Sequence, residues 1–252
     1  MTEYLLLVGV IIAACILLSG FAEKLPVPSL LIFIGLGMLF GENGPLGIIF
    51  NDYALSESVC TVCLVFVMFY GGFGTNMRAA RPVLARSFVL SSLGVLFTAL
   101  LVGSFVHLCL GFSWIESMII GSVISSTDAA SVFNILRSKK MALKDHTDSL
   151  LELESGSNDP MSYLLTVVTV SLATGENVSI PLLFAQQMVL GILGGILIGW
   201  SCVFLLNHLT FYMDQGRTIL VVAAAIIAYA LPSVLGGNGY LSVYFCGILM
   251  GN

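Results

Sequence analysis

The sequence has 252 residues, of which 58% are hydrophobic and only 9% are charged, and its formal net charge is −5 at pH 7. A typical soluble domain has about 25% charged residues. The composition therefore cannot provide a water-exposed surface and excludes a soluble globular protein. Apolar runs of roughly 17–25 residues are long enough to cross a bilayer as helices. The sequence predicts an all-α membrane protein that crosses the bilayer several times.

Nine apolar segments follow one another along the chain. The N-terminal region lacks the basic stretch and the small-residue cleavage site of a signal peptide, so we expect the first segment to stay as a membrane span. The prediction is a helix bundle with nine spans. In chain order they occupy residues 4–22, 25–40, 59–74, 84–110, 114–136, 148–173, 182–206, 218–231 and 239–252.

The basic residues indicate how these spans are oriented. If the N-terminus lies outside, all nine Lys and Arg fall in or beside the inward loops that follow spans one, three, five and seven. Because cytoplasmic loops are enriched in Lys and Arg, the sequence predicts a multi-pass protein of the inner or plasma membrane with its N-terminus outside. The nine residues are Lys24, Arg78, Arg81, Arg86, Arg137, Lys139, Lys140, Lys144 and Arg217.

Two similar segments indicate an internal repeat. Span two ends with GMLFGEN (37–43) and span nine ends with GILMGN (247–252). They are seven spans apart, so they cross in opposite directions, as in the inverted repeats of secondary transporters. Close helix packing is the alternative explanation of Gly-x-x-x-Gly. The repeat predicts three parts: 1–174 as a first six-helix repeat, 175–217 as a linking span, and 218–252 as the start of a second repeat.

Polar residues interrupt the apolar sequence of span six, in the stretch ELESGSNDP. Glu152, Ser155 and Asp159 are spaced i, i+3 and i+7, which places them on one helix face. Pro160 has no N–H and leaves the carbonyl of Gly156 without its usual donor. Capping of a helix N-terminus explains Glu152 but not Asp159, which lies about three turns further along. Because an acid at the centre of a span is costly, Asp159 is predicted to bind a cation.

Span five contains a second polar interruption, SSTD, within IIGSVISSTDAASVF. Ser and Thr compete for backbone hydrogen bonds, and unwound backbone at membrane depth is tolerated only where it lines protein or a cavity. A broken helix is therefore predicted. In the alternative, Ser125, Ser126 and Thr127 bond back into an intact helix, but that leaves Asp128 unexplained.

Together, STDAASVF and ELESGSNDP resemble the cation:proton antiporter family. The similarity also covers FYGGFGTN and RPVLARSFVLSSLGVLFTALLVG, and it is closest to the NhaP-type electroneutral branch and its bacterial potassium/proton antiporters. The resemblance implies thirteen spans, two inverted repeats and broken helices that cross at spans five and twelve, so this chain is expected to be truncated. It also implies a homodimer surrounded by membrane lipid, without a cofactor, enzymatic activity or nucleic-acid partner.

The resemblance further implies a mechanism of exchange. Asp159 would bind the transported monovalent cation, K⁺ or Na⁺, and the proton in turn, because one carboxylate cannot hold both. Neutral Asn158 would hold the core together where electrogenic relatives have a second acid, which fits the exchange of one cation for one proton. Without the second broken helix, residues 1–252 alone are not expected to transport.

Other residues receive supporting roles from the same resemblance. Thr127 would offer its carbonyl, Asp128 would balance the helix dipoles at the crossing, and Ser155 would add an oxygen ligand. Glu154 would orient the neighbouring amide. Tyr70 stands where related sequences carry an acid in span three, which affects affinity or selectivity if that acid binds the cation.

Two other functions remain open from the residues themselves. An intramembrane aspartyl protease needs acids on two adjacent helices, and Asp128 and Asp159 would be that pair. The Tyr-Asp and Gly-x-Gly-Asp settings of such a protease are missing from the sequence. An ion channel or channel-associated subunit would need a filter sequence or a pore ring, and we find neither.

Overall fold

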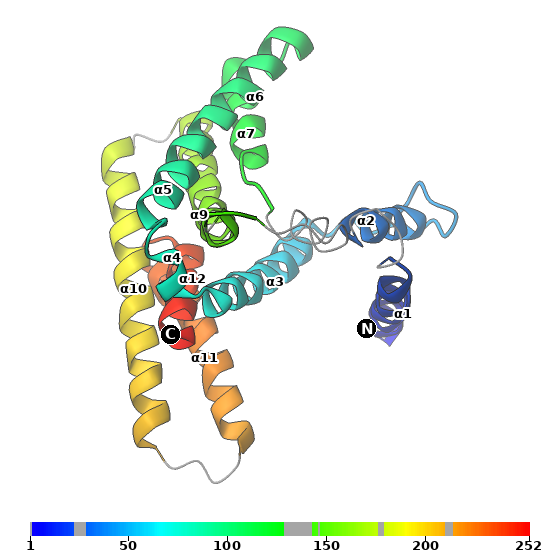
Figure 1. Ribbon diagram of the computed structural model, residues 1–252. Coiled ribbons are helices and arrows are strands. Elements are labelled where there is room, and N and C mark those ends of the chain that lie inside the picture. The colour runs from blue at the N-terminus through cyan, green and yellow to red at the C-terminus, as the bar shows by residue number, and fades with distance from the viewer. Residues whose placement is uncertain (1, 23–28, 129–142, 146, 176–178, 210–213) are drawn as a thin grey trace. The chain divides into compact units, whose positions relative to one another are not determined.

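The computed structural model describes residues 2–22, 29–128, 143–145, 147–175, 179–209 and 214–252 (Figure 1). The regular elements of this part of the chain are helices, and it contains no β-strand. The elements are α1 (Thr2–Ala22), α2 (Ser29–Phe40), α3 (Tyr53–Gly74), α4 (Met77–Ala80), α5 (Leu84–Val89), the π-helical turn η1 (Leu90–Gly94), α6 (Val95–Leu110), α7 (Trp114–Ile124), α9 (Thr147–Ala173), α10 (Ile180–His208), α11 (Asp214–Val234) and α12 (Gly239–Gly251).

Within the described residues, a helix lies in each of the nine predicted segments. By length and composition, four of these helices can cross a membrane. The nine crossings themselves stay a prediction, because shorter apolar helices cover other segments, such as Trp114–Ile124 and Gly239–Gly251. The four long apolar helices are Tyr53–Gly74, Leu84–Leu110, Ile180–His208 and Gln215–Val234.

Some helix bounds differ from the predicted ones for local reasons. Helix α3 begins at Tyr53 rather than residue 59, because the Asp52 carboxylate accepts a hydrogen bond from the Leu55 N–H at 2.9 Å and so caps the first turn. Helix α7 ends at Ile124, twelve residues before the predicted end at 136. Of the residues in between, 125–128 are described and are not helical, and 129–136 lie outside the described part of the chain.

The described residues separate into two compact units, one within residues 2–57 and the other within residues 58–252. In the first unit, α1 packs against α2. In the second unit, α6 packs against α7, α7 against α9, and α10, α11 and α12 against one another (Figure 1). The second unit contains the buried cluster Val65, Met68, Ala228, Tyr240, Val243 and Cys246.

Glycines allow the helices of the second unit to approach closely. A Cβ atom added to Gly247 would lie 2.5 Å from the carbonyl oxygen of Phe69, and one added to Gly251 would meet the carbonyl oxygen of Phe73. The Gly-x-x-x-Gly of span nine is therefore a packing face against α3, as is common in membrane helices. This contact accounts for one of the two motifs without a repeat, so the inverted repeat stays a prediction.

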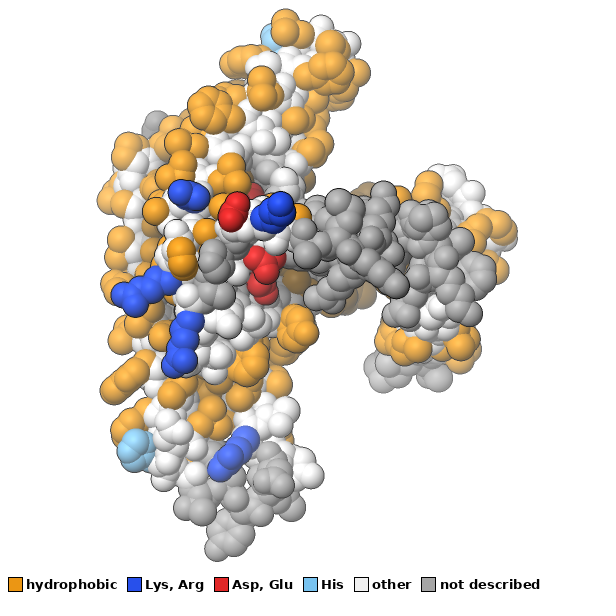
Figure 2. Space-filling model, viewed as in Figure 1, with side chains coloured by type: hydrophobic (Ala, Val, Ile, Leu, Met, Phe, Trp, Pro, Cys, Tyr) orange, Lys and Arg blue, Asp and Glu red, His pale blue; other side chains and the backbone are white. Residues whose placement is uncertain are grey.

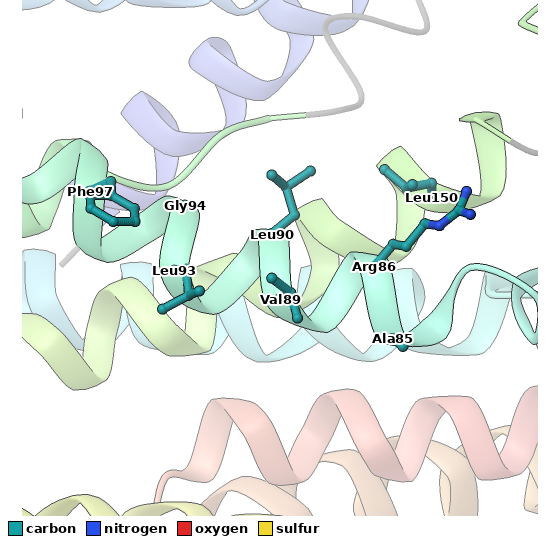
Figure 3. Close-up of a pocket in the computed structure, with 8 residues that line it drawn as sticks. All are labelled: Ala85, Arg86, Val89, Leu90, Leu93, Gly94, Phe97 and Leu150. Atoms are coloured by element: carbon teal, nitrogen blue, oxygen red, sulfur yellow. The ribbon is translucent and has the colours of Figure 1, made fainter.

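Many large hydrophobic side chains of the described residues are exposed. They are spread over the face shown in Figure 2, and on α6 the side chains of Leu101 and Leu108 are 71% and 79% exposed. A shallow groove runs along α5, η1 and the start of α6, where Arg86 is the charged member of an otherwise apolar lining (Figure 3). Such a surface suits contact with lipid, and the groove contains none of the predicted site residues.

Candidate functional site

Helix α7 ends inside span five, at the polar interruption where a broken helix is predicted. Helix α7 starts with a capping box formed by Ser113 and Glu116, and its last helical residue is Ile124. The Ser125 hydroxyl donates to the carbonyl oxygen of Ser122 at 2.6 Å, and residues 126–128 are not helical. The backbone therefore leaves the helix at SSTD, with Ser125 as the C-cap of α7, and the broken helix stays a prediction. The continuation of span five falls on residues 129–142, outside the described part.

Helix α9 carries the polar residues that face this break. It runs without interruption from Thr147 to Ala173 and includes Pro160, which is buried within it. Asn158 is completely buried and Glu154 is only 9% exposed, whereas Asp159 is half-buried. The helix therefore presents a buried amide and a partly accessible carboxylate to the unwound segment.

The Asn158 amide binds the break to α9 through both of its polar atoms. Its Nδ2 lies 2.6 Å from Thr127 Oγ1, 3.3 Å from the Thr127 carbonyl oxygen and 3.1 Å from Glu154 Oε1. Its Oδ1 accepts a hydrogen bond from the Ser126 hydroxyl at 3.0 Å. A buried amide with partners on both atoms holds its neighbours in one arrangement.

The Asp159 carboxylate lies directly beside the break. Its Oδ1 is a hydrogen-bond partner of the Ser126 hydroxyl, and it interacts electrostatically with Asp128 and Glu154. Asp128 is exposed at the end of the described segment. The two acids that an aspartyl protease would need are thus neighbours, but the hydroxyl of Ser126 bridges from Asp159 to the Asn158 amide rather than to the second acid.

The Thr127 carbonyl, expected to face a cation, has protein donors instead. Besides the Asn158 amide, the Ser155 hydroxyl donates to this oxygen at 2.9 Å. The Thr127 hydroxyl in turn donates toward Glu154, at 3.3 Å from Oε2. The structure therefore brings six of the predicted site residues together where segment 125–128 meets α9, and their roles in binding stay predictions. They are Thr127, Asp128, Glu154, Ser155, Asn158 and Asp159. The carbonyl oxygen of Pro160 instead accepts a hydrogen bond from Asn238.

A second polar contact between α7 and α9 was not predicted. The Ser162 hydroxyl donates to the carbonyl oxygen of Ser122 at 2.7 Å, and the Ser122 and Thr169 hydroxyl oxygens lie 3.1 Å apart. The sequence contains a signal for it, because Ser155, Ser162 and Thr169 recur every seven residues and so share one face of α9. That face is the one that packs against α7.

Asn238 and Tyr244 are further unpredicted neighbours of α9. The Asn238 amide donates to the carbonyl oxygen of Pro160 at 3.0 Å, and its side-chain oxygen accepts the Leu241 N–H at the start of α12. The ring of Tyr244 packs on Gly156, where an added Cβ would lie 2.5 Å from Cε2. The GGNGY sequence indicates a turn before α12 but not its contact with α9.

The donors at the junction are oxygen atoms of carboxylates, hydroxyls and carbonyls. Hard cations prefer such ligands. Within the described ranges, no group of three or more His, Cys, Asp or Glu is placed to hold a metal ion. The arrangement therefore provides one half-buried carboxylate with hydroxyl neighbours, which suits reversible binding of a cation or a proton.

Comparison with known proteins identifies relatives along the whole chain. The chain is 34% identical to the K⁺/H⁺ antiporter NhaP2 of Shewanella baltica over 255 residues, and 35% identical to the K⁺/H⁺ antiporter NhaP of Alkalimonas amylolytica over 251 residues. These matches cover 99% and 98% of this chain but only 44% of each relative. The chain thus spans less than half the length of these relatives.

A solved structure and a family profile agree with these relatives. The sodium proton antiporter MjNhaP1 of Methanocaldococcus jannaschii superposes with a TM-score of 0.81 at 22% identity, covering 100% of this chain and 62% of that one. This match confirms the predicted antiporter type of helix bundle. The family described as "Sodium/hydrogen exchanger, transmembrane" matches residues 10–252. The chain therefore belongs to the sodium/hydrogen exchanger family of membrane transporters.

Proposed function

We propose that this chain carries the ion site of a secondary transporter that exchanges K⁺ or Na⁺ for H⁺. The observation that supports it is the half-buried Asp159 carboxylate beside the unwound segment 125–128, with the Ser126 hydroxyl bonded to it. Relatives named as K⁺/H⁺ and Na⁺/H⁺ antiporters indicate the class of substrate. A carboxylate can bind either ion but not both, so each ion displaces the other and the two fluxes are coupled.

The stoichiometry follows from the residue next to this carboxylate. Asn158 is a neutral amide whose Nδ2 donates to Glu154 and Thr127, so it adds no second exchangeable charge. The Glu154 carboxylate accepts hydrogen bonds from the Thr127 hydroxyl and the Asn158 amide. Because these donors occupy it, we do not expect Glu154 to bind the exchanged ions. We therefore propose that each cycle moves one cation against one proton. Moving a net charge would cost about 2.3 kcal/mol per 100 mV, so exchange that ignores an imposed membrane potential is expected.

Asp159→Asn tests this proposal. In the intact protein reconstituted in proteoliposomes, the variant should abolish proton movement driven by K⁺ or Na⁺, because an amide neither binds nor releases a proton at physiological pH. Glu116→Gln is the matched control: it neutralises an exposed acid at the start of α7 and keeps a side chain that can still cap. Retained cation-driven proton movement in Asp159→Asn would show that another residue carries the ions.

We also propose the orientation with the N-terminus outside and, as the resemblance implies, a homodimer in the inner or plasma membrane. In a variant without native cysteines, Arg78→Cys and Arg217→Cys should react with an impermeant thiol reagent from the inside only, and Glu116→Cys from the outside only. Reaction of positions 78 and 217 from opposite sides would contradict the topology. Cross-linking of the intact protein in membranes tests the dimer.

A further inference from the structure

The Ser126 hydroxyl has two acceptors but only one proton. Its Oγ lies 3.0 Å from Asn158 Oδ1 and is also a hydrogen-bond partner of Asp159 Oδ1. A hydroxyl has a single O–H and two lone pairs, so it donates to one of these oxygens at a time. Whenever its proton turns to the amide, a lone pair of Ser126 is directed toward the carboxylate.

The orientation of the Asn158 amide makes this choice well defined. Its Nδ2 faces three acceptors, namely the Thr127 carbonyl oxygen, Thr127 Oγ1 and Glu154 Oε1. The nitrogen must therefore point to that side, and Oδ1 must face Ser126 as an acceptor. Because Asn158 is completely buried, this acceptor is fixed in place.

We propose that the Ser126 hydroxyl is a direct ligand of the transported cation, with its oxygen beside the Asp159 carboxylate and its proton on Asn158 Oδ1. The inference rests on the proposed function and adds a binding residue to that site. In the empty site the hydroxyl donates to Asp159 and screens its charge. When a cation binds, the O–H rotates to Asn158 and the oxygen faces the cation. When a proton binds instead, Asp159 donates it to the same oxygen.

This rotation gives both ions the same partner. The proton of Ser126 is conserved throughout and only changes its acceptor, so no proton is lost or gained by the hydroxyl. With either ion bound, Asn158 Oδ1 accepts the proton of Ser126, and a lone pair of Ser126 contacts the cation or accepts the proton of Asp159. The Thr127 carbonyl oxygen accepts hydrogen bonds from Ser155 and Asn158. With Ser126 as the ligand, both of these hydrogen bonds can remain when the cation binds.

The alternative is that Ser126 has a purely structural role. A variant of the neighbouring Ser125 distinguishes a structural role from a role in cation binding. Ser125 precedes Ser126 in the chain and is buried, but its hydroxyl donates to the carbonyl oxygen of Ser122 at 2.6 Å and belongs to the end of α7. Ser125→Ala therefore removes a structural hydrogen bond of the same segment without touching the carboxylate. It is the matched control for Ser126→Ala.

The test measures equilibrium binding of K⁺ and Na⁺ to the purified intact protein, together with exchange in proteoliposomes. Ser126→Ala should weaken cation binding about tenfold or more, the effect of losing one contact to a charged group. The half-saturating cation concentration for exchange should rise by the same factor while the maximal rate stays near that of the wild type. Ser126→Cys keeps the size but offers a soft sulfur that suits these cations poorly, so it should behave like Ser126→Ala. Ser126→Thr should restore most of the affinity, and Ser125→Ala should keep it.

Wild-type affinity in Ser126→Ala and Ser126→Cys would overturn the proposal, as would an equal loss in Ser125→Ala. A fall in the maximal rate with unchanged affinity would likewise assign Ser126 a structural role. These outcomes differ from failure of the proposed function itself. In that case the wild-type protein neither binds nor exchanges either cation, or its exchange survives Asp159→Asn.

Discussion

Asn238 connects three helices, and its replacement should measure how firmly α9 is held. Its side chain is completely buried. The amide nitrogen donates to the Pro160 carbonyl oxygen on α9, the side-chain oxygen caps α12 through the Leu241 N–H, and the backbone N–H donates to the Gln187 carbonyl oxygen on α10. Two of these three bonds depend on the side chain, and different substitutions separate them.

The expected losses follow from these two bonds. Asn238→Ala removes a helix cap, which costs about 1 kcal/mol, and a buried hydrogen bond, which contributes about 1 kcal/mol. Asn238→Ser keeps an oxygen that can cap α12 but has no amide to reach Pro160, so it should lose only about 1 kcal/mol. With about 2–4 °C per kcal/mol for a chain of this size, the midpoint of thermal unfolding should fall by about 4–8 °C for Asn238→Ala and by about half as much for Asn238→Ser.

Thermal unfolding of the detergent-solubilised protein, followed by the loss of its monodisperse fraction, provides the measurement. Ser201→Ala is the control, because the exposed Ser201 hydroxyl only bonds back to the Leu197 carbonyl oxygen within α10. It should change the midpoint by less than about 2 °C. Equal losses for the two Asn238 variants would refute a separate contribution from the cap. A midpoint for Asn238→Ala within the range of the control would refute both contributions.

Two further substitutions test close packing in the second unit. Gly121→Ala should destabilise by about 1–3 kcal/mol, because its Cβ would meet the backbone of α6, including the Gly103 nitrogen at 2.9 Å. Gly71→Ala, with nothing within 4 Å of the added atom, should instead be neutral or stabilising. Gly156→Ala should cost a similar 1–3 kcal/mol against the buried Tyr244 ring, and Tyr244→Ala in the same chain should relieve part of that loss. Additive losses in the double variant would contradict this contact.

The local features of the site were predictable from the sequence because each depends on a short stretch of chain. The SSTD run predicts an end to helix α7, since its hydroxyls bond to nearby carbonyl oxygens, as Ser125 does. The i, i+4 spacing of Glu154 and Asn158 places their side chains together on α9, and the structure has them 3.1 Å apart. The acids among apolar residues indicate a functional site by their cost alone.

The contacts between distant segments were not predictable in this way. Asn238 and Pro160 are 78 positions apart, and no periodicity in either segment requires them to meet. The sequence did not distinguish Ser126 from Ser125 and Thr127, because a run of hydroxyl residues does not indicate which one faces Asp159. That choice depends on where α7 ends and on the rotation of α9 about its axis, which the Ser162 and Ser122 contact helps to set.

The hydrogen bonds that satisfy the backbone after the end of α7 also determine which groups lie next to the Asp159 carboxylate. Where a helix ends at membrane depth, the freed carbonyl oxygens need donors, because lipid supplies none. At Thr127 these donors are the Ser155 hydroxyl and the Asn158 amide, so α9 must present polar groups at this depth even without an ion. Once Nδ2 of Asn158 is committed to that task, Oδ1 is left facing Ser126, and Asp159 follows one position later on the helix. The nearest group with a choice of two acceptors is then the Ser126 hydroxyl, and this is why we propose that it responds to the ion at Asp159.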